Sequence, residues 1–309
     1  DNTSLAIGVK IENPEACLRY SGLTISGLQV KDSPEWLCNR LKAVGLRPIN
    51  NIVDITNFVL METGQPLHAF DAAYVTGNQV IVKKMPTGSK FVTLDETERS
   101  LGADDLMICN VSEPMCIAGV FGGAKSGVSE ITTSIFLESA YFDGTHVRKT
   151  SKLHGLKTDA SFRFERGADP NITVFALKRA ALLIKEIAGG TISSEIVDVY
   201  PSPVKNFEVE VSYKRINTLI GKSIEKDTVK SILKALAIEI VSENEEGLLL
   251  SIPPFKVDVT READVVEEIL RIYGYNNIEI REEVLSSLSY SLNPDPHKIQ
   301  NLVSDYLAG

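Results

Sequence analysis

The chain has 309 residues, of which 43% are hydrophobic and 24% are charged, and its formal net charge is −9. This composition is typical of a soluble globular protein, and the negative charge argues against a protein that coats nucleic acid by charge alone. The sequence has no apolar run near the ~18 residues of a membrane span and no secretory signal at its N-terminus, so we expect a cytoplasmic protein without membrane contacts.

The first third of the chain is predicted to contain strands followed by two helices. Residues 1–33 alternate weakly between apolar and polar positions, which predicts strands joined by short turns. One helix is expected from Ser33-Pro34 to a stop at Gly45. A second helix is expected to be capped by Asn50 or Asn51 and to end at Gly64, and the LHAF segment after it is expected to be extended.

The middle of the chain is predicted to mix strands and helices without strict alternation. Strands are expected over residues 78–85, 90–95, 105–110, 115–123 and 133–142, and a long helix over residues 171–188. This order favours an α+β fold, in which a mixed α/β domain comes first.

Pro201 and Pro203 mark a linker to a second, smaller domain. Its expected elements are short strands and two helices, over residues 226–237 and 261–272. Their order suits a winged or helix-turn-helix-like fold.

Polar side chains stand out in the stretch of residues 50–71. Thr56 and Asn57 lie on the expected helix and His68 on the extended segment after it, so the three are expected to converge on one concave site. Taken singly, such residues are more often hydrogen-bonded parts of a core than parts of an active site.

Glu138 is the sharpest single candidate, because its apolar neighbours in FLESAYF make a charge costly unless it is paired. If these neighbours line a pocket, the carboxylate would accept a hydrogen bond from a ligand hydroxyl. The alternative is that Glu138 points to solvent from an alternating strand.

Two further segments carry candidate site residues. The glycines of AGVFGGAKSGV would let the backbone approach a ligand closely or would form a hairpin turn. The loop HGLKTDAS combines small residues, which suit a pocket wall, with Lys152, Lys157 and Arg163, which would meet an RNA backbone or lie solvated.

An acidic group in the second domain is the candidate metal site. Asp264, Glu267 and Glu268 share one face of the expected helix, and Asp258 lies in the segment that leads into it. Such oxygen ligands suit Mg²⁺ better than zinc, although an acidic face near a helix start is usually solvated.

The stretch NNIVDITNFVLMETGQPLHAFD resembles the signature of the beta subunit of bacterial phenylalanyl-tRNA synthetases, in the domain that hydrolyses mischarged tRNA. The resemblance continues through FGGAKSGV, FLESAYF, HGLKTDASFRFERGADP and VVEEILRIYGYNNI, and so covers most of the chain. One departure is Asn277-Ile278-Glu279, where a proline often follows the Tyr-Gly-Tyr motif.

The resemblance implies four segments in this chain. Residues 1–33 would end a preceding β-rich domain, 34–200 would be the tRNA-editing domain, 205–275 the small domain with the acidic metal site, and 276–309 the start of a truncated following domain. We interpret the chain as a piece of a longer polypeptide, because it lacks an initiator Met and ends just after an amphipathic run.

The resemblance also implies roles for the candidate residues. Glu138 would read the hydroxyl of a mischarged tyrosine, with Gly122 and Ala160 leaving room for its ring. Thr56, Asn57, His68 and Thr158 would position the ester and a water, with His68 acting as a base or only as an orienting donor. Asp258, Asp264, Glu267 and Glu268 would be magnesium ligands in a site shared with the alpha subunit.

The implied assembly is a heterotetramer of two alpha and two beta subunits that binds tRNA(Phe). ATP would be used by the whole enzyme and not bound by this chain, because aminoacylation belongs to the alpha subunit in this family. Two other readings stay open at this point. The chain would be a non-catalytic scaffold for the alpha subunit, or a nucleic-acid-binding module that uses residues 205–275.

Overall fold

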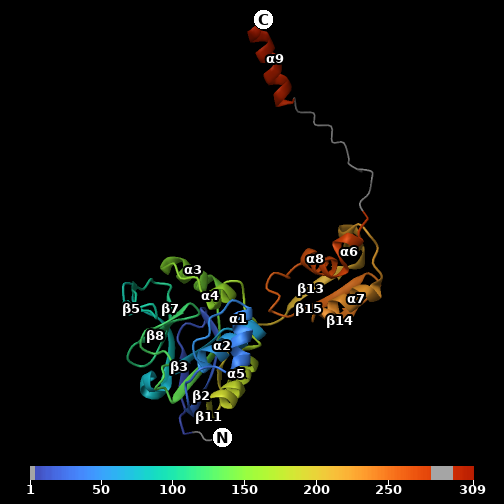
Figure 1. Cartoon of the computed structure of the whole chain (residues 1–309). Helices are drawn as coiled ribbons and strands as arrows, with labels where there is room; N and C mark the ends of the chain where they lie inside the picture. The colour runs from blue at the N-terminus through green and yellow to red at the C-terminus, as the bar shows by residue number, and fades with distance from the viewer. Residues whose placement is uncertain (1–3, 280–294) are drawn as a thin grey trace.

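Two sheets and a layer of helices form the larger part of the molecule (Figure 1), which is a computed structural model that describes residues 4–279 and 295–309. The first sheet has the strand order β1-β4-β7-β8-β9, and only the β1–β4 pair is parallel. Its strands are β1 (Gly8–Ile11), β4 (Gln79–Lys84), β7 (Leu106–Cys109), β8 (Pro114–Ile117) and β9 (Phe121–Gly122).

The second sheet is antiparallel and has the order β11-β2-β10-β3, with β12 also paired to β2. Its strands are β2 (Cys17–Leu28), β3 (Leu67–Asp71), β10 (Ser134–Phe142), β11 (Gly189–Ile192) and β12 (Val197–Val199). The boundary expected at residue 33 therefore differs from the structure. Strand β2 pairs along its length with β10, and it belongs to the same sheet as the strands that follow it in the chain.

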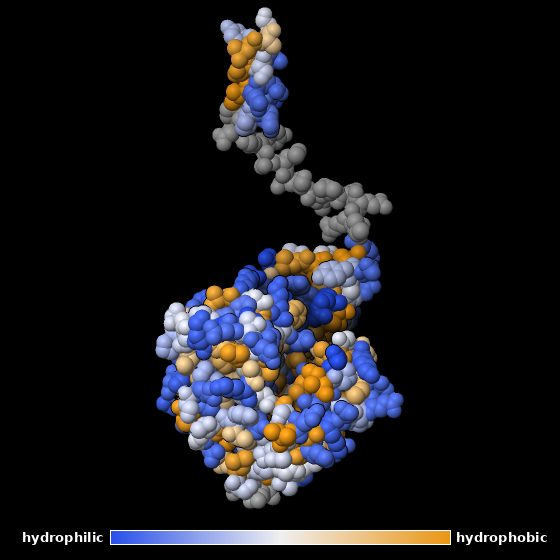
Figure 2. Space-filling view, turned by 60° about the vertical axis from the view of Figure 1, so that its left-hand side comes forward, coloured by the Kyte–Doolittle hydropathy of each residue, from blue (hydrophilic) through white to orange (hydrophobic). Residues whose placement is uncertain are grey.

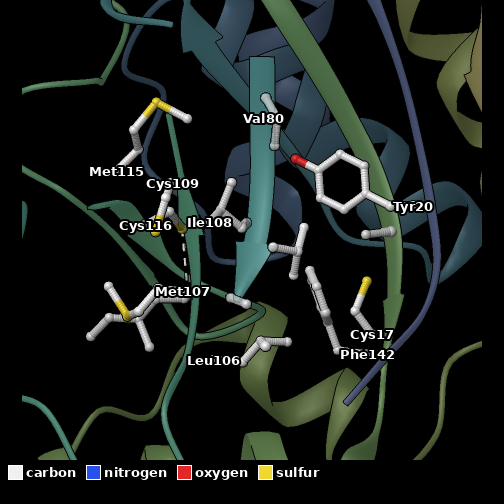
Figure 3. Close-up of a cluster of buried hydrophobic side chains, with 14 of the residues drawn as sticks. Cys17, Tyr20, Val80, Leu106, Met107, Ile108, Cys109, Met115, Cys116 and Phe142 are labelled. Atoms are coloured by element: carbon white, nitrogen blue, oxygen red, sulfur yellow. Dashed lines mark hydrogen bonds between the residues drawn. The ribbon is translucent and has the colours of Figure 1, made fainter. Parts of the chain in front are cut away.

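A hydrophobic core fills the space between the two sheets. Tyr20 and Phe142 come from the second sheet and Val80 and Ile108 from the first, and Figure 3 shows these side chains in one cluster. Gly22 has a packing role here, because a Cβ at this position would lie 2.3 Å from the Phe136 ring. The absent side chain lets the ring lie across β2.

A second core lies between the other face of β2 and β10 and three helices. These are α1 (Glu35–Ala43), α2 (Asn51–Thr63) and α5 (Thr173–Ala188). The predicted ends of α2 are confirmed, since the Asn50 side chain accepts hydrogen bonds from the amides of Ile52 and Val53, and Gly64 is left-handed with φ of 77°.

Shorter elements connect these layers near one edge. They are the hairpin of β5 (Lys90–Val92) and β6 (Glu98–Ser100), and the helices α3 (Gly144–His154) and α4 (Asp159–Phe164). Val147 of α3 and Phe164 of α4 pack into the core between the sheets. These contacts hold α3 and α4 against the core between the sheets.

Residues 207–273 form a separate small unit with its own core. The strand order is β13-β15-β14, and the two helices α6 and α7 follow each other across a short turn before the β14–β15 hairpin. This is the winged, helix-turn-helix-like order that the sequence predicts, and the α+β class is confirmed. The elements are β13 (Phe207–Ser212), α6 (Tyr213–Ile220), α7 (Lys226–Ala235), β14 (Glu239–Glu243), β15 (Gly247–Ile252) and α8 (Glu262–Tyr273).

The end of the chain forms helix α9 (Pro296–Ala308), and hydrophobic residues gather along one of its sides in Figure 2. The domain expected over residues 276–309 includes residues 280–294, which lie outside the described part. Among the helices of residues 4–279 and 295–309, none is long and apolar enough to cross a membrane.

Candidate functional site

A pocket of about 360 Å³ brings together six of the seven residues expected at an editing site. It receives side chains from α2, β3, β9, β10 and the start of α4, so segments more than a hundred residues apart in sequence meet in it. Its size falls in the range of small-molecule sites. The six residues are Asn57, His68, Gly122, Glu138, Thr158 and Ala160.

Glu138 and His68 are directly opposite each other in the antiparallel pair of β10 and β3. Opposite residues of such a pair point to the same face of the sheet, here the face that meets the first sheet. Glu138 is only 5% exposed, so it does not point to solvent. Of the two alternatives that the sequence left open for Glu138, the structure therefore agrees with the one in which apolar neighbours surround a buried carboxyl group.

The Tyr20 hydroxyl donates a hydrogen bond to Oε2 of Glu138, and the two oxygens are 2.5 Å apart. Burial raises the pKa of Glu138 to about 8, although the bond from Tyr20 opposes this shift. Within residues 4–279 and 295–309, no group donates to the other oxygen, Oε1. One oxygen of Glu138 is thus held by the protein and the other is left for a ligand.

His68 packs its ring edge-on against Phe70, with the ring centroids 4.5 Å apart. Burial lowers the pKa of His68 to about 4, so the ring is neutral at physiological pH. In the described part of the chain, neither the His68 ring nor the Asn57 amide has a hydrogen-bond partner. Both side chains line the pocket with their polar groups available to a ligand.

Gly122 forms a wall of the pocket beside His68. A Cβ at this position would lie 2.8 Å from Cδ1 of Leu94 and 3.2 Å from Cε1 of His68. A glycine fits here because neighbouring side chains occupy the space that a Cβ would need. This steric reason explains Gly122 more directly than the hairpin turn that the glycine cluster suggests. Ala160, in the first turn of α4, adds a second small wall residue.

The two threonines have structural roles. Thr158 caps α4, because its Oγ1 accepts a hydrogen bond from the Ser161 amide at 3.1 Å and donates one to the Val120 carbonyl at 2.9 Å. Thr56 is buried, donates to the Val53 carbonyl at 2.7 Å and is absent from the pocket lining. The structure therefore brings Thr158 to the pocket and leaves Thr56 outside it.

Tyr20 is a site residue that sequence reasoning missed. It lies on β2, 118 positions before Glu138, and both side chains are buried. The local sequence CLRYSGL shows only an alternating strand. The signal would emerge only from the register of β2 against β10, in which Tyr20 is opposite Ala140, two positions along β10 from Glu138 and on the same face of the sheet.

The four acidic residues of the small domain do not form a magnesium site by themselves. Asp264 accepts hydrogen bonds from the Arg261 amide and guanidinium at the start of α8, and Glu268 is paired with Lys256 and Arg271. Among the residues that the structure describes, no group of three or more potential ligands is close enough to hold a metal. The donor set thus does not fit the ion in this chain alone, and the shared site stays a prediction.

Family models match two parts of this chain. The B3/4 domain matches residues 16–189, which is more than half of the chain, and the tRNA synthetase B5 domain matches residues 209–275. A protein of Bacteroides fragilis named phenylalanine–tRNA ligase beta subunit is 57% identical over the whole chain. The chain belongs to the phenylalanine–tRNA ligase beta subunit family.

Other members of this family are similar to the chain at lower identity. The beta subunit of Porphyromonas gingivalis is 53% identical over 98% of the chain, and that of Geobacter sulfurreducens is 44% identical over 88%. The chain spans 34–38% of the length of these three relatives. A crystal structure of an N-terminal fragment of the beta subunit from Pyrococcus horikoshii aligns with 89% of the chain and 76% of that fragment, at 14% identity and a TM-score of 0.42.

Proposed function

We propose that this part of the beta subunit hydrolyses tyrosine from mischarged Tyr-tRNA(Phe). The observation that supports this most strongly is the buried Glu138 carboxyl group, with one oxygen held by Tyr20 and the other facing a pocket that also contains His68 and Asn57. A synthetase site for phenylalanine rejects an added hydroxyl only about a hundredfold, so a second site that requires the hydroxyl is needed.

Glu138 would select tyrosine in either protonation state. Below a pH of about 8 its carboxylic acid donates a hydrogen bond to the phenol oxygen, and above this pH the carboxylate accepts one from the phenol. Phenylalanine offers neither partner, and leaving the buried group unpaired costs about 1–3 kcal/mol. The correct product, Phe-tRNA(Phe), is therefore spared.

His68 and Asn57 would orient the ester and the attacking water. Because His68 is neutral and its pKa is about 4, it is a weak base, and an orienting hydrogen bond suits it better than proton abstraction. Among the described residues that line the pocket, no nucleophile is paired with a base, which favours a positioned water over a covalent intermediate. Thr158 would contribute by fixing the start of α4, where Ala160 lies.

The test is the hydrolysis of Tyr-tRNA(Phe) by the assembled enzyme with and without Glu138→Ala. We expect the change to reduce tyrosine release by about tenfold or more, since one buried hydrogen bond is lost. Ser139→Ala is the matched control, because Ser139 is the next residue of β10 and its buried hydroxyl has no partner among the described residues. Equal rates for the two variants would reject the proposal.

The same assay over a range of pH tests the role of His68. An orienting role predicts that His68→Ala lowers the rate without moving the inflections of the pH profile. A profile of the unaltered enzyme with an inflection near pH 4 that His68→Ala removes would instead assign the base to His68.

The scaffold reading remains the second candidate, because the B5 match and the small domain fit a docking role. It predicts normal hydrolysis after Glu138→Ala. We further propose that the chain acts with an alpha subunit that carries aminoacylation and the ATP site, in a heterotetramer that binds tRNA(Phe). Magnesium bound between the subunits would require the carboxylates of α8 to exchange their present ion-pair partners for the metal.

A further inference from the structure

A basic groove lies between α3 and α4, beside the pocket. Its volume is about 760 Å³, and its lining includes Arg148, Lys152, Lys157, Phe162 and Arg166. Arg148 and Lys152 are four residues apart on α3, so they share one face of that helix. Four cations thus gather on one side of a chain whose net charge is −9.

Three of these cations are free to meet a ligand. Arg148, Lys152 and Lys157 are exposed, and none has an ion-pair partner within residues 4–279 and 295–309. Arg166 is different, because it is paired with Glu165 at 2.6 Å. The groove therefore offers three unneutralised positive charges to an anionic partner.

An exposed aromatic ring accompanies the charges. Phe162 is 52% exposed, and the Arg166 guanidinium lies over its ring at 3.6 Å from the centroid. Aromatic rings and arginine planes both accept stacked bases in proteins that bind single-stranded nucleic acid, while neighbouring cations contact the phosphates. An acidic protein surface would also be attracted by the charges, but it has no bases that stack on the aromatic ring.

The groove and the pocket are neighbours that share a lining residue. Thr158 lines both cavities, and Lys157 precedes it in the chain. A strand that occupies the groove is thus led to the wall that carries Ala160.

We infer that this groove binds the single-stranded 3′ end of the tRNA and delivers its terminal ester to the pocket. Arg148, Lys152 and Lys157 contact phosphates, and the Phe162–Arg166 pair stacks against a base. This inference rests on the proposed function, since it names the path by which the substrate reaches that site.

The experiment compares the triple variant Arg148→Ala/Lys152→Ala/Lys157→Ala with the control Lys42→Ala/Lys178→Ala/Lys185→Ala in the assembled enzyme. The control removes the same charge from exposed, unpaired lysines of the described α1 and α5. We expect the groove variant to raise KM for Tyr-tRNA(Phe) about tenfold or more near 0.15 M salt and to reduce the salt slope by about 2, while kcat is retained.

A second pair of variants tests the stacking platform. Phe162→Leu is expected to raise KM by about fivefold or more, and Phe162→Tyr, which keeps a ring, is expected to leave it unchanged. Equal effects of the two would overturn the stacking part of the inference.

A small substrate separates this inference from the proposed function. The tyrosyl ester of adenosine enters the pocket without using the groove, so the groove variant should hydrolyse it normally. If both substrates are hydrolysed and the groove variant behaves like the control, the groove is not the RNA path. A groove variant that loses only alpha-subunit association would point to a protein partner and would also overturn the inference.

If the unaltered enzyme hydrolyses neither substrate, the proposed function fails. The role of the groove is then tested by measuring the affinity of the groove and control variants for tRNA(Phe) over the same range of salt concentration. If the dependence of log affinity on log salt concentration is weaker in the groove variant only, the result supports the groove as the RNA path. Identical salt dependence in both variants rejects that role.

Discussion

Burial changes the protonation of Glu138 from that of an exposed glutamate. The residue lies in the core between the two sheets, where an ionised carboxyl group is costly, and the hydroxyl of Tyr20 is its one described hydrogen-bond donor. Most of its pKa rise comes from this loss of water. The carboxyl group is therefore mostly protonated and uncharged at neutral pH, and it is able to form a hydrogen bond with a ligand hydroxyl.

The raised pKa of Glu138 makes the stability of the protein depend on pH. In the folded state this pKa is about 8 instead of 4.5, so the folded protein holds the proton more tightly than the unfolded chain. Its contribution to stability is fully present below pH 4.5 and is lost as the pH rises through 8. Glu138→Gln removes this loss. Between pH 6 and pH 9 we expect the unaltered protein to lose about 3 kcal/mol of stability relative to the variant.

Denaturant unfolding at the two pH values measures this difference. Glu62→Gln is the control, because Glu62 is exposed and its pKa is lowered by Arg179. If the Glu138→Gln and unaltered proteins lose stability in parallel between pH 6 and 9, the buried carboxyl group is ionised throughout and this account of Glu138 is wrong.

At the residue scale, the sequence predicted most of the pocket but not the role of each residue in it. The family motif and the order of helix and strand were enough to bring Asn57, His68 and Glu138 together. The hydroxyls of Thr56 and Thr158 donate hydrogen bonds to backbone carbonyls, that of Val53 in the same helix and that of Val120 far away in the sequence. Such bonds depend on backbone geometry, which residue type alone does not reveal.

At the scale of elements, local sequence signals predicted where helices begin and end, but they did not predict which strands pair over long sequence distances. Helix α2 begins and ends where its asparagine cap and its glycine predict. Strand β2, in contrast, was assigned to a preceding domain, although it pairs with β10 and with β11 near residue 190. No local pattern specifies a partner more than a hundred residues away, so Tyr20 was missed for the same reason.

A substitution in the short strand β9 tests whether the space in the pocket limits the rate of hydrolysis. Gly122→Ala introduces a methyl group against Leu94 and His68, and we expect tyrosine release to fall about tenfold while the fold is kept, because the Leu94 side chain is able to move. Steady-state hydrolysis of Tyr-tRNA(Phe) measures the effect.

Gly127→Ala is the matched control for this change. A Cβ at Gly127 would meet only Leu94 at 3.6 Å, which is an ordinary contact. Full activity in Gly122→Ala, or an equal loss in both variants, would show that the wall beside His68 does not shape the site.

At the scale of the whole molecule, the layered arrangement explains where the pocket lies. The core between the sheets is interrupted where β3 and β10 meet β9 and α4, and the polar residues gather there. The small domain with α6, α7 and α8 has a separate core and contributes no residue to the pocket lining. The proposed selection of tyrosine would thus be a property of the larger unit.

The central claim is that the pocket prefers tyrosine because of Glu138. The most direct measurement is the affinity of the assembled enzyme for non-hydrolysable amide analogues of tyrosyl-adenosine and phenylalanyl-adenosine, with and without Glu138→Ala. We predict that the unaltered enzyme binds the tyrosyl analogue at least about tenfold more tightly than the phenylalanyl analogue, and that the variant loses this preference. Equal binding of the two analogues by the unaltered enzyme, or a preference that survives in the variant, would contradict the claim.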